Sequence, residues 1–315
     1  MKQEFIRGGM KRKRQTISII FLAMAATGSP AQPVAGMPSA VVLEIRRGFT
    51  EQGSITPEWK EAIRDRQSEE SLNVVERNKR PVSADESGWL SLIEEKVQSW
   101  RGMIDSLRFP FVDISPPDTL TILLGNQGGS DAFSPSATTI CFDLSQLTEY
   151  GGASSSLNRE RIDRFFAHEF THVLHNLWAA NHGLQLRTPL DLALWACLKE
   201  GLGNYRSLSD KWVSEKGKLT DHALAVLAHL QPIFVERLSA LEHATEKDAP
   251  RLMEGLSMGP FEQKWGALTV ALWLAQEADG DDRNLQKWVA KGPKGVLELA
   301  RMYLPEELRG KLPNP

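Results

Sequence analysis

FAHEFTHVLHNLW, residues 166–178, is the stretch that most strongly constrains the fold of this chain. On an α-helix, residues four apart differ in direction by about 40° after a full turn, so His168 and His172 project from the same face. His175 lies close to that face. The opposite side of the same helix is apolar and carries Phe166, Phe170, Val173, Leu174 and Leu177. This spacing predicts a helix with an apolar back in the core and a histidine-bearing front.

The two histidines and the acid beside the first form an HExxH pattern, which indicates chemistry as well as structure. Imidazole nitrogens are ordinary zinc ligands, and two on one helix face can hold one ion. Glu169 lies beside them and can take a proton from a zinc-activated water, so the pattern indicates a hydrolytic zinc site with Glu169 as general base. The alternative is that the histidines are exposed to solvent or hydrogen-bonded within the core. Neither role would require three histidines within eight residues of sequence.

A third protein ligand is needed to complete such a site, and the pattern does not continue to a third histidine in the metzincin manner. In HExxHxxGxxH sites a glycine and a histidine follow, but this chain has His175 and Trp178 at those positions. A glutamate on a following helix is the other common solution. The segment LDLALWACLKEGLGNY, within a helix predicted over residues 188–208, supplies Glu200.

The surroundings of Glu200 favour a ligand over an ordinary exposed glutamate, which is the alternative. Leu198, Leu202 and two glycines make the stretch apolar, and a lone carboxylate there requires a partner. Asn204 lies one turn further on the same face, where its amide oxygen could orient a ligand. His175 is the reserve ligand, although its use with His172 would move the ion away from Glu169.

Together, HEFTHVLH and KEGLGNY resemble the gluzincin metallopeptidases, in which HExxH and a downstream glutamate bind zinc. The resemblance extends over about residues 119–278 and is greatest to bacterial predicted zinc-dependent proteases with an EGxAxY-type second motif. It implies that His168, His172 and Glu200 are zinc ligands and that Glu169 is the catalytic base. The chain departs from the pattern at Gly203, where alanine is more usual, and at Asn204, where many gluzincins have aspartate.

Two short runs upstream of the motif predict strands of a small sheet: TLTILLGNQGG from Thr119 and SATTICFDL from Ser136. Both are rich in β-branched and apolar residues and are bounded by Gly, Ser and Pro. In the resembled fold an edge strand lies over the metal and pairs with the substrate backbone. Residues 137–142 are the best candidate for that strand, and the alternative is that both runs are plain core strands.

The first 31 residues have the organisation of a secretory signal peptide. Residues 11–14 are basic, residues 17–28 are apolar, and Ser29 and Ala31 occupy the small-residue positions of a cleavage site. The apolar run is short for a permanent span, so a retained anchor is the second interpretation. Met10 directly precedes the basic block and is a second candidate start. The later apolar stretches around Ala223 and Leu268 contain polar interruptions, so we expect no further membrane helix.

Charge and cysteine content limit the partners. Without residues 1–31 the chain loses six basic residues and one acidic residue, a net change of five, and its formal charge goes from −3 to −8. An acidic protein without nucleic-acid motifs is not expected to bind DNA or RNA, so the expected partner is a peptide or protein substrate. Cys141 and Cys197 are expected either to form a disulfide in an oxidising compartment or to remain buried free thiols.

The predicted organisation is a signal peptide at 1–31, a flexible lead rich in Pro and Gly at 32–56, and one catalytic domain at 57–315. Its sheet part covers about 116–150 and its helical part about 156–315, which makes an α+β, mainly helical, zincin-like fold. Further helices are predicted over residues 59–78, 89–107, 221–241, 259–277 and 295–304.

The combined interpretation is an exported zinc peptidase, secreted or periplasmic, with a non-catalytic zinc-stabilised binding protein of the same fold as the alternative. A donor that stabilises the developing oxyanion is also required. The sequence leaves it open and offers six candidates: Tyr150, Tyr205, Tyr303, Arg206, His222 and His229.

Export is directly testable on the expressed protein. We predict that the mature chain begins near Gln32 and is recovered in soluble form outside the cytoplasm, because the basic and apolar segments match a cleavable signal. Intact-mass spectrometry of fractionated cells measures this. An N-terminus that retains residues 11–14 on membrane-associated protein would instead support the retained anchor.

Overall fold

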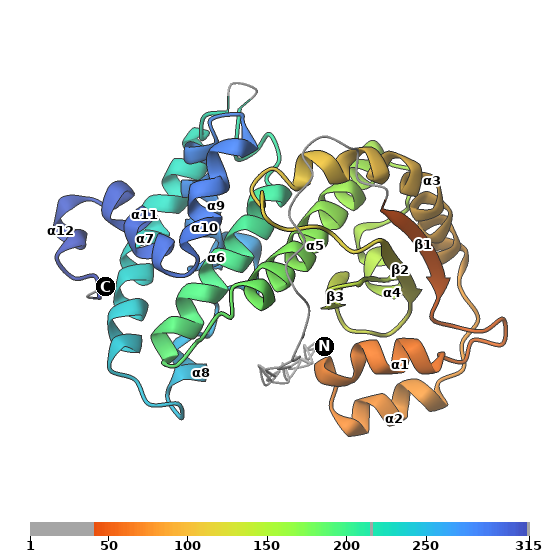
Figure 1. Cartoon of the computed structure of the whole chain (residues 1–315). Helices are drawn as coiled ribbons and strands as arrows, with labels where there is room; N and C mark the ends of the chain where they lie inside the picture. Colours follow the sequence, from red (N-terminus) through yellow and green to blue (C-terminus); the bar gives the residue numbers. More distant parts are fainter. Residues whose placement is uncertain (1–40, 215–216, 314–315) are drawn as a thin grey trace, which may run out of the picture.

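The computed structural model describes residues 41–214 and 217–313, which form a mixed α and β fold with a small sheet and many helices (Figure 1). This confirms the predicted mainly helical class with a sheet upstream of the HExxH helix. The signal peptide and the first part of the lead, up to residue 40, lie outside the described residues. The sheet-bearing part lies to one side of the HExxH helix, and most of the later helices lie to the other.

A four-stranded sheet has the order β1-β2-β4-β3. β1 (Val42–Arg47), β2 (Thr119–Gly125) and β4 (Thr139–Asp143) are parallel, and β3 (Ala132–Ser136) pairs antiparallel with β4 at the edge. The two predicted strands are therefore confirmed as β2 and β4.

Two expectations about the sheet are wrong. The flexible lead predicted over 32–56 contains β1, because Leu43 is buried against the core and the strand pairs with β2 along its whole length. Residues 137–142 are not an edge strand, since β4 lies between β2 and β3, and the edge strand that contacts the HExxH helix is β3. β3 has the sequence AFSPS, and a proline is tolerated on an outer strand because it need not donate to a neighbour.

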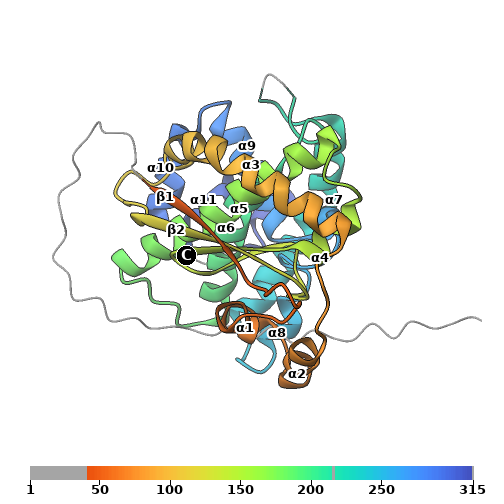
Figure 2. The same cartoon turned by 90° about the vertical axis from the view of Figure 1, so that its right-hand side faces the viewer.

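Each face of the sheet is covered by helices, as expected where parallel strands are buried on both sides. On one face, Leu123, Phe133 and Cys141 pack with Trp59 of α1 (Pro57–Ile63) and with α2 (Glu69–Arg77). Residues of the opposite face, including Ile122 and Phe142, join the main core with α3 (Ala84–Leu107) and α5 (Ser156–Asn181). Figure 2 shows α1 and α2 on the far side of the sheet from α3.

The single helix predicted over residues 59–78 is two helices. α1 ends in a 3₁₀ turn, η1 (Arg64–Arg66), and α2 starts anew because Ser68 caps it by accepting from the backbone N–H of Ser71. The other predicted helices are present. α3 begins with a capping box between Ser83 and Glu86, and Trp100 from its middle stacks on Phe166 of α5 at 4.4 Å.

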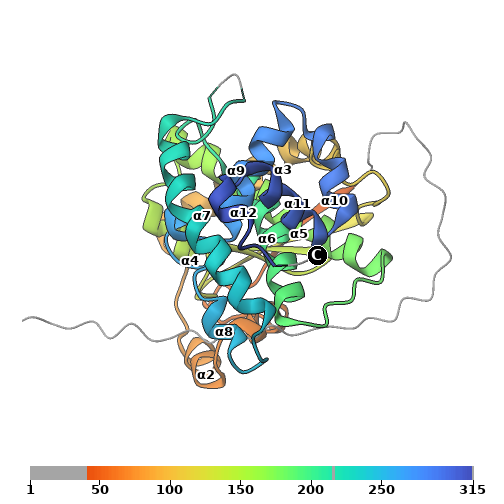
Figure 3. The same cartoon turned by 90° about the vertical axis from the view of Figure 1, so that its left-hand side faces the viewer.

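The later helices lie together (Figure 3) and contribute residues to the same main core. α6 (Pro189–Ser207) begins with a capping box between Thr188 and Asp191 and packs between α5 and α9 (Ala267–Ala278). The helix predicted to begin at residue 259 begins only at Ala267, because a loop and a 3₁₀ turn precede it. The remaining elements are α4 (Leu144–Leu147), α7 (Asp221–Glu242), α8 (Ala249–Leu252), α10 (Gln286–Lys291), α11 (Lys294–Tyr303), α12 (Glu306–Arg309), η2 (Thr148–Tyr150), η3 (Phe261–Gln263) and η4 (Asp282–Leu285).

One helix of the described chain, α7, is long and apolar enough by length and composition to cross a membrane, contrary to the expectation that no later stretch would qualify. It packs against α6, α8 and α9. Buried residues such as Leu230 and Phe234 alternate around it with exposed ones such as Leu224 and His229. This pattern is also that of an amphipathic helix on the core of a globular protein.

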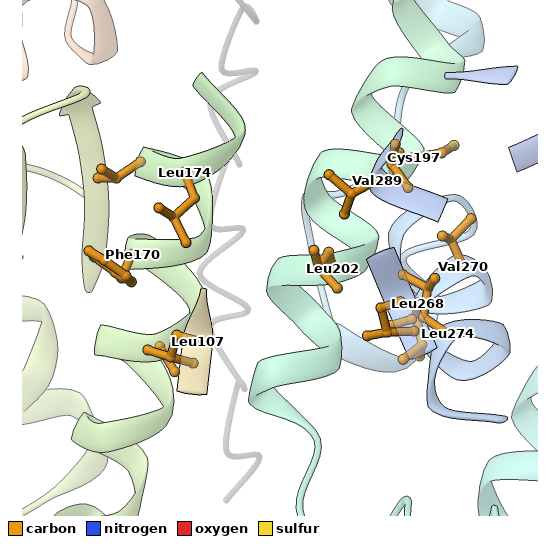
Figure 4. Packing of buried hydrophobic residues seen from close by; sticks show 14 of the residues in the cluster. Leu107, Phe170, Leu174, Cys197, Leu202, Leu268, Val270, Leu274 and Val289 are labelled. Carbon is orange, nitrogen blue, oxygen red and sulfur yellow. The ribbon is translucent and has the colours of Figure 1, made fainter. Parts of the chain in front are cut away.

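Both cysteines are free and buried, so the disulfide alternative is wrong. Cys141 belongs to the small cluster under α1 and α2, whereas Cys197 belongs to the main core. Figure 4 shows Cys197 and Leu202 on α6 in the half of the view that also holds Leu268 and Val270 of α9, with Phe170 and Leu174 of α5 in the other half.

The contact between α6 and α9 depends on Gly201. A Cβ atom at this position would lie 2.6 Å from Val270 Cγ1, closer than packed side chains allow. The missing side chain therefore lets the two helices approach closely.

We predict that Gly201→Ala destabilises the fold by about 1–3 kcal/mol through overpacking, although alanine favours a helix by about 1 kcal/mol over glycine. In a Val270→Ala background, Gly201→Ala should cost less stability, because the nearer clashing methyl group is gone and only the Cβ atom of residue 270, 2.8 Å away, remains. Denaturant unfolding of the four proteins measures this coupling. An equal loss of stability in both backgrounds would show that the contact is not what requires glycine.

Candidate metal centre

Helix α5 brings three potential ligands together at the floor of a cleft. Atoms of His168, Glu169 and His172 that can bind a metal all lie within 4.8 Å of one another. The two imidazoles are nearly perpendicular, with ring centroids 4.6 Å apart. The apolar back of the helix is buried as predicted, which fixes this front towards the cleft.

Helix α6 places Glu200 against the same pair of histidines. One carboxylate oxygen is 3.5 Å from His172 Nε2 and the other is 3.9 Å from His168 Nε2. The Glu200 side chain is 28% exposed and lines the cleft, so it is not an ordinary solvated glutamate. Two imidazole nitrogens and one carboxylate therefore converge from two helices, and this donor set suits zinc.

The two carboxylates near the histidines differ in their environments. Burial raises the pKa of Glu169 above its ordinary value, and this outweighs the opposing effects of His172 and of a hydrogen bond from Ser134. Burial also acts on Glu200, but the attraction of His172 and His168 holds the pKa of Glu200 well below its ordinary value. A raised pKa suits a general base, whereas a persistently ionised carboxylate suits a ligand.

Ser134 of the edge strand fixes the position of Glu169. Its hydroxyl is 2.9 Å from both the backbone oxygen and Oε2 of Glu169, and it donates to them. Glu169 Oε1 remains directed to the histidines, 4.0 Å from His168 Nε2. The sheet edge and the HExxH helix are thereby tied together at the residue expected to act as base.

Gly203 allows α6 to approach the histidines. A Cβ atom there would lie 2.9 Å from His168 Nε2 and 3.0 Å from His172 Cε1. The departure from the more usual alanine therefore has a physical reason, because a methyl group would occupy space next to both imidazoles. The glycine forms part of the cradle that an ion bound by these nitrogens would require.

Ser207 orients His168. His168 Nδ1 and Ser207 Oγ are 3.1 Å apart, and the same hydroxyl donates to the backbone oxygen of Gly203. The hydroxyl then accepts from Nδ1–H, which leaves the lone pair of Nε2 directed at the site. Burial, reinforced by the charge of His172, lowers the pKa of His168 to about 3, so the ring is neutral and able to bind a metal.

Two residues that were expected to support the metal site, Asn204 and His175, do not do so in the structure. Asn204 is buried and lines the cleft, but among the described residues its side chain makes no hydrogen bond to His168, His172 or Glu200, and the bond that orients His168 comes from Ser207. His175 is fully buried with its ring between Phe111 and Trp195, at centroid distances of 4.9 and 5.4 Å. It does not line the cleft and is therefore not a reserve ligand.

The cleft above the site has a volume of about 720 Å³. One wall comes from β3 and the first half of α5, including Ser134 and Phe165, and the other comes from α6 and residues 257–264. The site residues lie between these walls. A chain of several residues could therefore reach the histidines from outside.

Most of the six candidate oxyanion donors are engaged elsewhere. Tyr205 and Arg206 both contact Asp282, Tyr303 donates to Glu277, His222 lies 3.3 Å from Glu262, and His229 is exposed on α7. Tyr150 lines the cleft but donates to Asp131.

Ser134, Ser207 and Lys264 also line the cleft, and none of them was expected there from the sequence. Ser207 could have been found, because it lies two turns after Glu200 on the same predicted helix. Ser134 belongs to a strand with little sequence signal, and Lys264 comes from a loop whose path the sequence does not give.

Comparisons with protein-family models, with curated proteins and with solved structures give no match for this chain. The assignment of the site therefore depends on the donor atoms themselves. Two imidazole nitrogens, an ionised carboxylate and the space left by Gly203 fit a zinc ion.

We predict that Gly203→Ala weakens zinc binding by about tenfold or more, as expected when the support of ligating histidines is disturbed. Competition with a chromogenic chelator measures the affinity. Gly201→Ala is the matched control, since it introduces the same methyl group on the same helix but towards α9. If both variants bind zinc as wild type does, Gly203 has no role in shaping the site.

Proposed function

We propose that this chain is a zinc-dependent peptidase with a zincin-like fold of gluzincin type. The observation that carries the proposal is the convergence of His168 and His172 from α5 with Glu200 from α6 at the floor of an open cleft. A structural zinc site usually closes four protein ligands and leaves no room for a base. Here a separate buried carboxylate, Glu169, lies beside the three candidate ligands.

In this proposal His168, His172 and Glu200 hold the ion. When bound, zinc supplies Lewis acidity that activates a water and polarises the peptide carbonyl. Glu169 accepts the proton of the attacking water through the carboxylate that faces the histidines, and can pass it to the leaving amine. Ser134 keeps this carboxylate in place, and the raised pKa of Glu169 makes it a better proton acceptor.

The edge strand supports a peptide as substrate. Among the described residues β3 pairs with β4 alone, so its outer edge offers free backbone groups beside Glu169. An extended peptide can add to such an edge through main-chain hydrogen bonds. In this arrangement β3, rather than residues 137–142, performs the role expected of the substrate-binding strand. The expected export would place this activity in the periplasm or outside the cell.

Exchange of each carboxylate for its amide separates the proposed roles. Glu169→Gln cannot accept the proton, so peptide hydrolysis should fall by at least about a hundredfold while zinc content and melting temperature stay near wild type. Glu200→Gln replaces an anionic ligand with a weak neutral one, so zinc affinity should fall with activity and added zinc should restore part of it. The measurements are hydrolysis of a peptide library, zinc content and thermal unfolding.

A double variant, His168→Ala with His172→Ala, is the control for the ligand set and should retain no stoichiometric zinc. If wild type binds zinc but cuts no peptide, or if Glu169→Gln cuts as fast as wild type, the peptidase mechanism is wrong. A non-catalytic zinc-stabilised binding protein would then be the better account.

A further inference from the structure

Cationic side chains surround the cleft of a chain whose formal net charge is −3. Outside the site carboxylates Glu169 and Glu200, the cleft is lined by two acidic residues, Asp131 and Glu262. Its cationic lining residues are Arg66, Arg161, Arg164, Lys199, Lys211 and Lys264. The residues that line the cleft therefore carry a net positive charge, whereas the chain as a whole carries a net negative charge.

Most of these cations are not neutralised by neighbouring carboxylates. Lys211 pairs with Glu262 at 2.5 Å, and Arg164 has a long contact of 3.5 Å with Glu160. In the described part of the chain the other four cations have no carboxylate within ion-pair distance, and the two arginines among them stack on aromatic rings. These stacked pairs are Arg66 on Phe133 at 4.5 Å and Arg161 on Tyr150 at 4.2 Å.

Stacking holds the two arginines in place without neutralising them. An aromatic ring restricts a guanidinium and leaves its N–H groups free to bind an anion. Arg161 also donates to Asn158, and Arg66 to Ser130, both of which are uncharged partners. The guanidinium groups of both arginines are therefore held in place, and their positive charges are not paired with a carboxylate.

The spacing on α5 relates two of these arginines to the site. Arg164 and Arg161 precede His168 by four and seven residues, so they lie on the same face of the helix. At 1.5 Å per residue they are displaced from His168 by about 6 and 10 Å along the helix axis. An extended peptide advances about 3.3 Å per residue, so these distances correspond to about two and three residues from the reacting bond.

On this basis we propose that the cleft selects acidic peptides, with aspartate or glutamate about two to three residues from the bond at the site, recognised by Arg161, Arg164 and Arg66. This inference rests on the proposed function only for the position of the bond, because the recognition itself is a matter of binding. Arginine binds a carboxylate with two parallel hydrogen bonds, and in a half-enclosed cleft such contacts are screened less than on an open surface. Lys199 and Lys264, on the opposite wall, add to the same potential.

Peptide binding to the zinc-loaded Glu169→Gln full chain tests the inference without turnover. Three fluorescein-labelled peptides are compared that differ only in having glutamate, glutamine or lysine at the same positions. We expect the glutamate peptide to bind about tenfold or more tightly than the glutamine peptide, and the lysine peptide more weakly than both. This preference should shrink as salt is raised from low to high concentration, since it is electrostatic.

Arginine variants test which residues recognise the glutamate side chains of the peptide. Arg161→Gln combined with Arg164→Gln should remove most of the preference for glutamate while binding of the glutamine peptide changes little. Arg159→Gln is the matched control, because Arg159 is on the same helix but pairs with Glu95 outside the cleft. It should keep the full preference.

Equal binding of the glutamate and glutamine peptides, or a preference that does not respond to salt, would overturn the inference whether or not the arginine variants fold. A single-stranded oligonucleotide that displaces the glutamate peptide at lower concentration would also overturn it. Failure of the proposed function gives a different result. In that case wild type would hydrolyse none of the three peptides, although the preference in binding would persist.

Discussion

The close approach of α6 to α5 at Gly203 is the constraint on which the site depends. Without a side chain at this position, the helix backbone lies against the edges of both imidazoles. Glu200, almost one turn earlier on α6, then comes within 3.5 to 3.9 Å of their Nε2 atoms. On the other side, Gly201 allows a similarly close contact with Val270 of α9. One helix is thus held between two neighbours by two glycines, and its carboxylate is positioned as a consequence.

A second contact joins the sheet to this pair of helices. Ser134 of the edge strand donates to the backbone oxygen and the carboxylate of Glu169, so the outer strand, the candidate base and the candidate ligands form one connected unit. The contrast between the carboxylates follows from their partners. Glu200 faces two imidazoles, which favour its charge, whereas Glu169 is buried with a single hydroxyl donor and has a raised pKa. The same few contacts therefore set both the positions and the pKa values of the two carboxylates.

Local spacing was sufficient to predict the helix that carries His168 and His172, its buried back, the helix that carries Glu200, and the strands β2 and β4. These features depend on periodicity within one segment. β1 and β3 were missed because their burial comes from pairing with distant strands, and AFSPS has little strand character by itself. The position of His175 was misjudged for a related reason. A helical wheel gives its direction, but only the arrangement of Phe111 and Trp195 around it shows that this direction leads into the core.

An open zinc site formed by two histidines and one glutamate is the feature on which the proposed chemistry depends. X-ray absorption at the zinc edge, recorded on the purified full chain after zinc loading, tests it most directly. We expect one zinc per chain with only nitrogen and oxygen neighbours at about 2.0–2.2 Å and the outer-shell pattern of two imidazoles. A sulfur neighbour at about 2.3 Å, which would implicate Cys141 or Cys197, or a protein that retains no zinc, would contradict it.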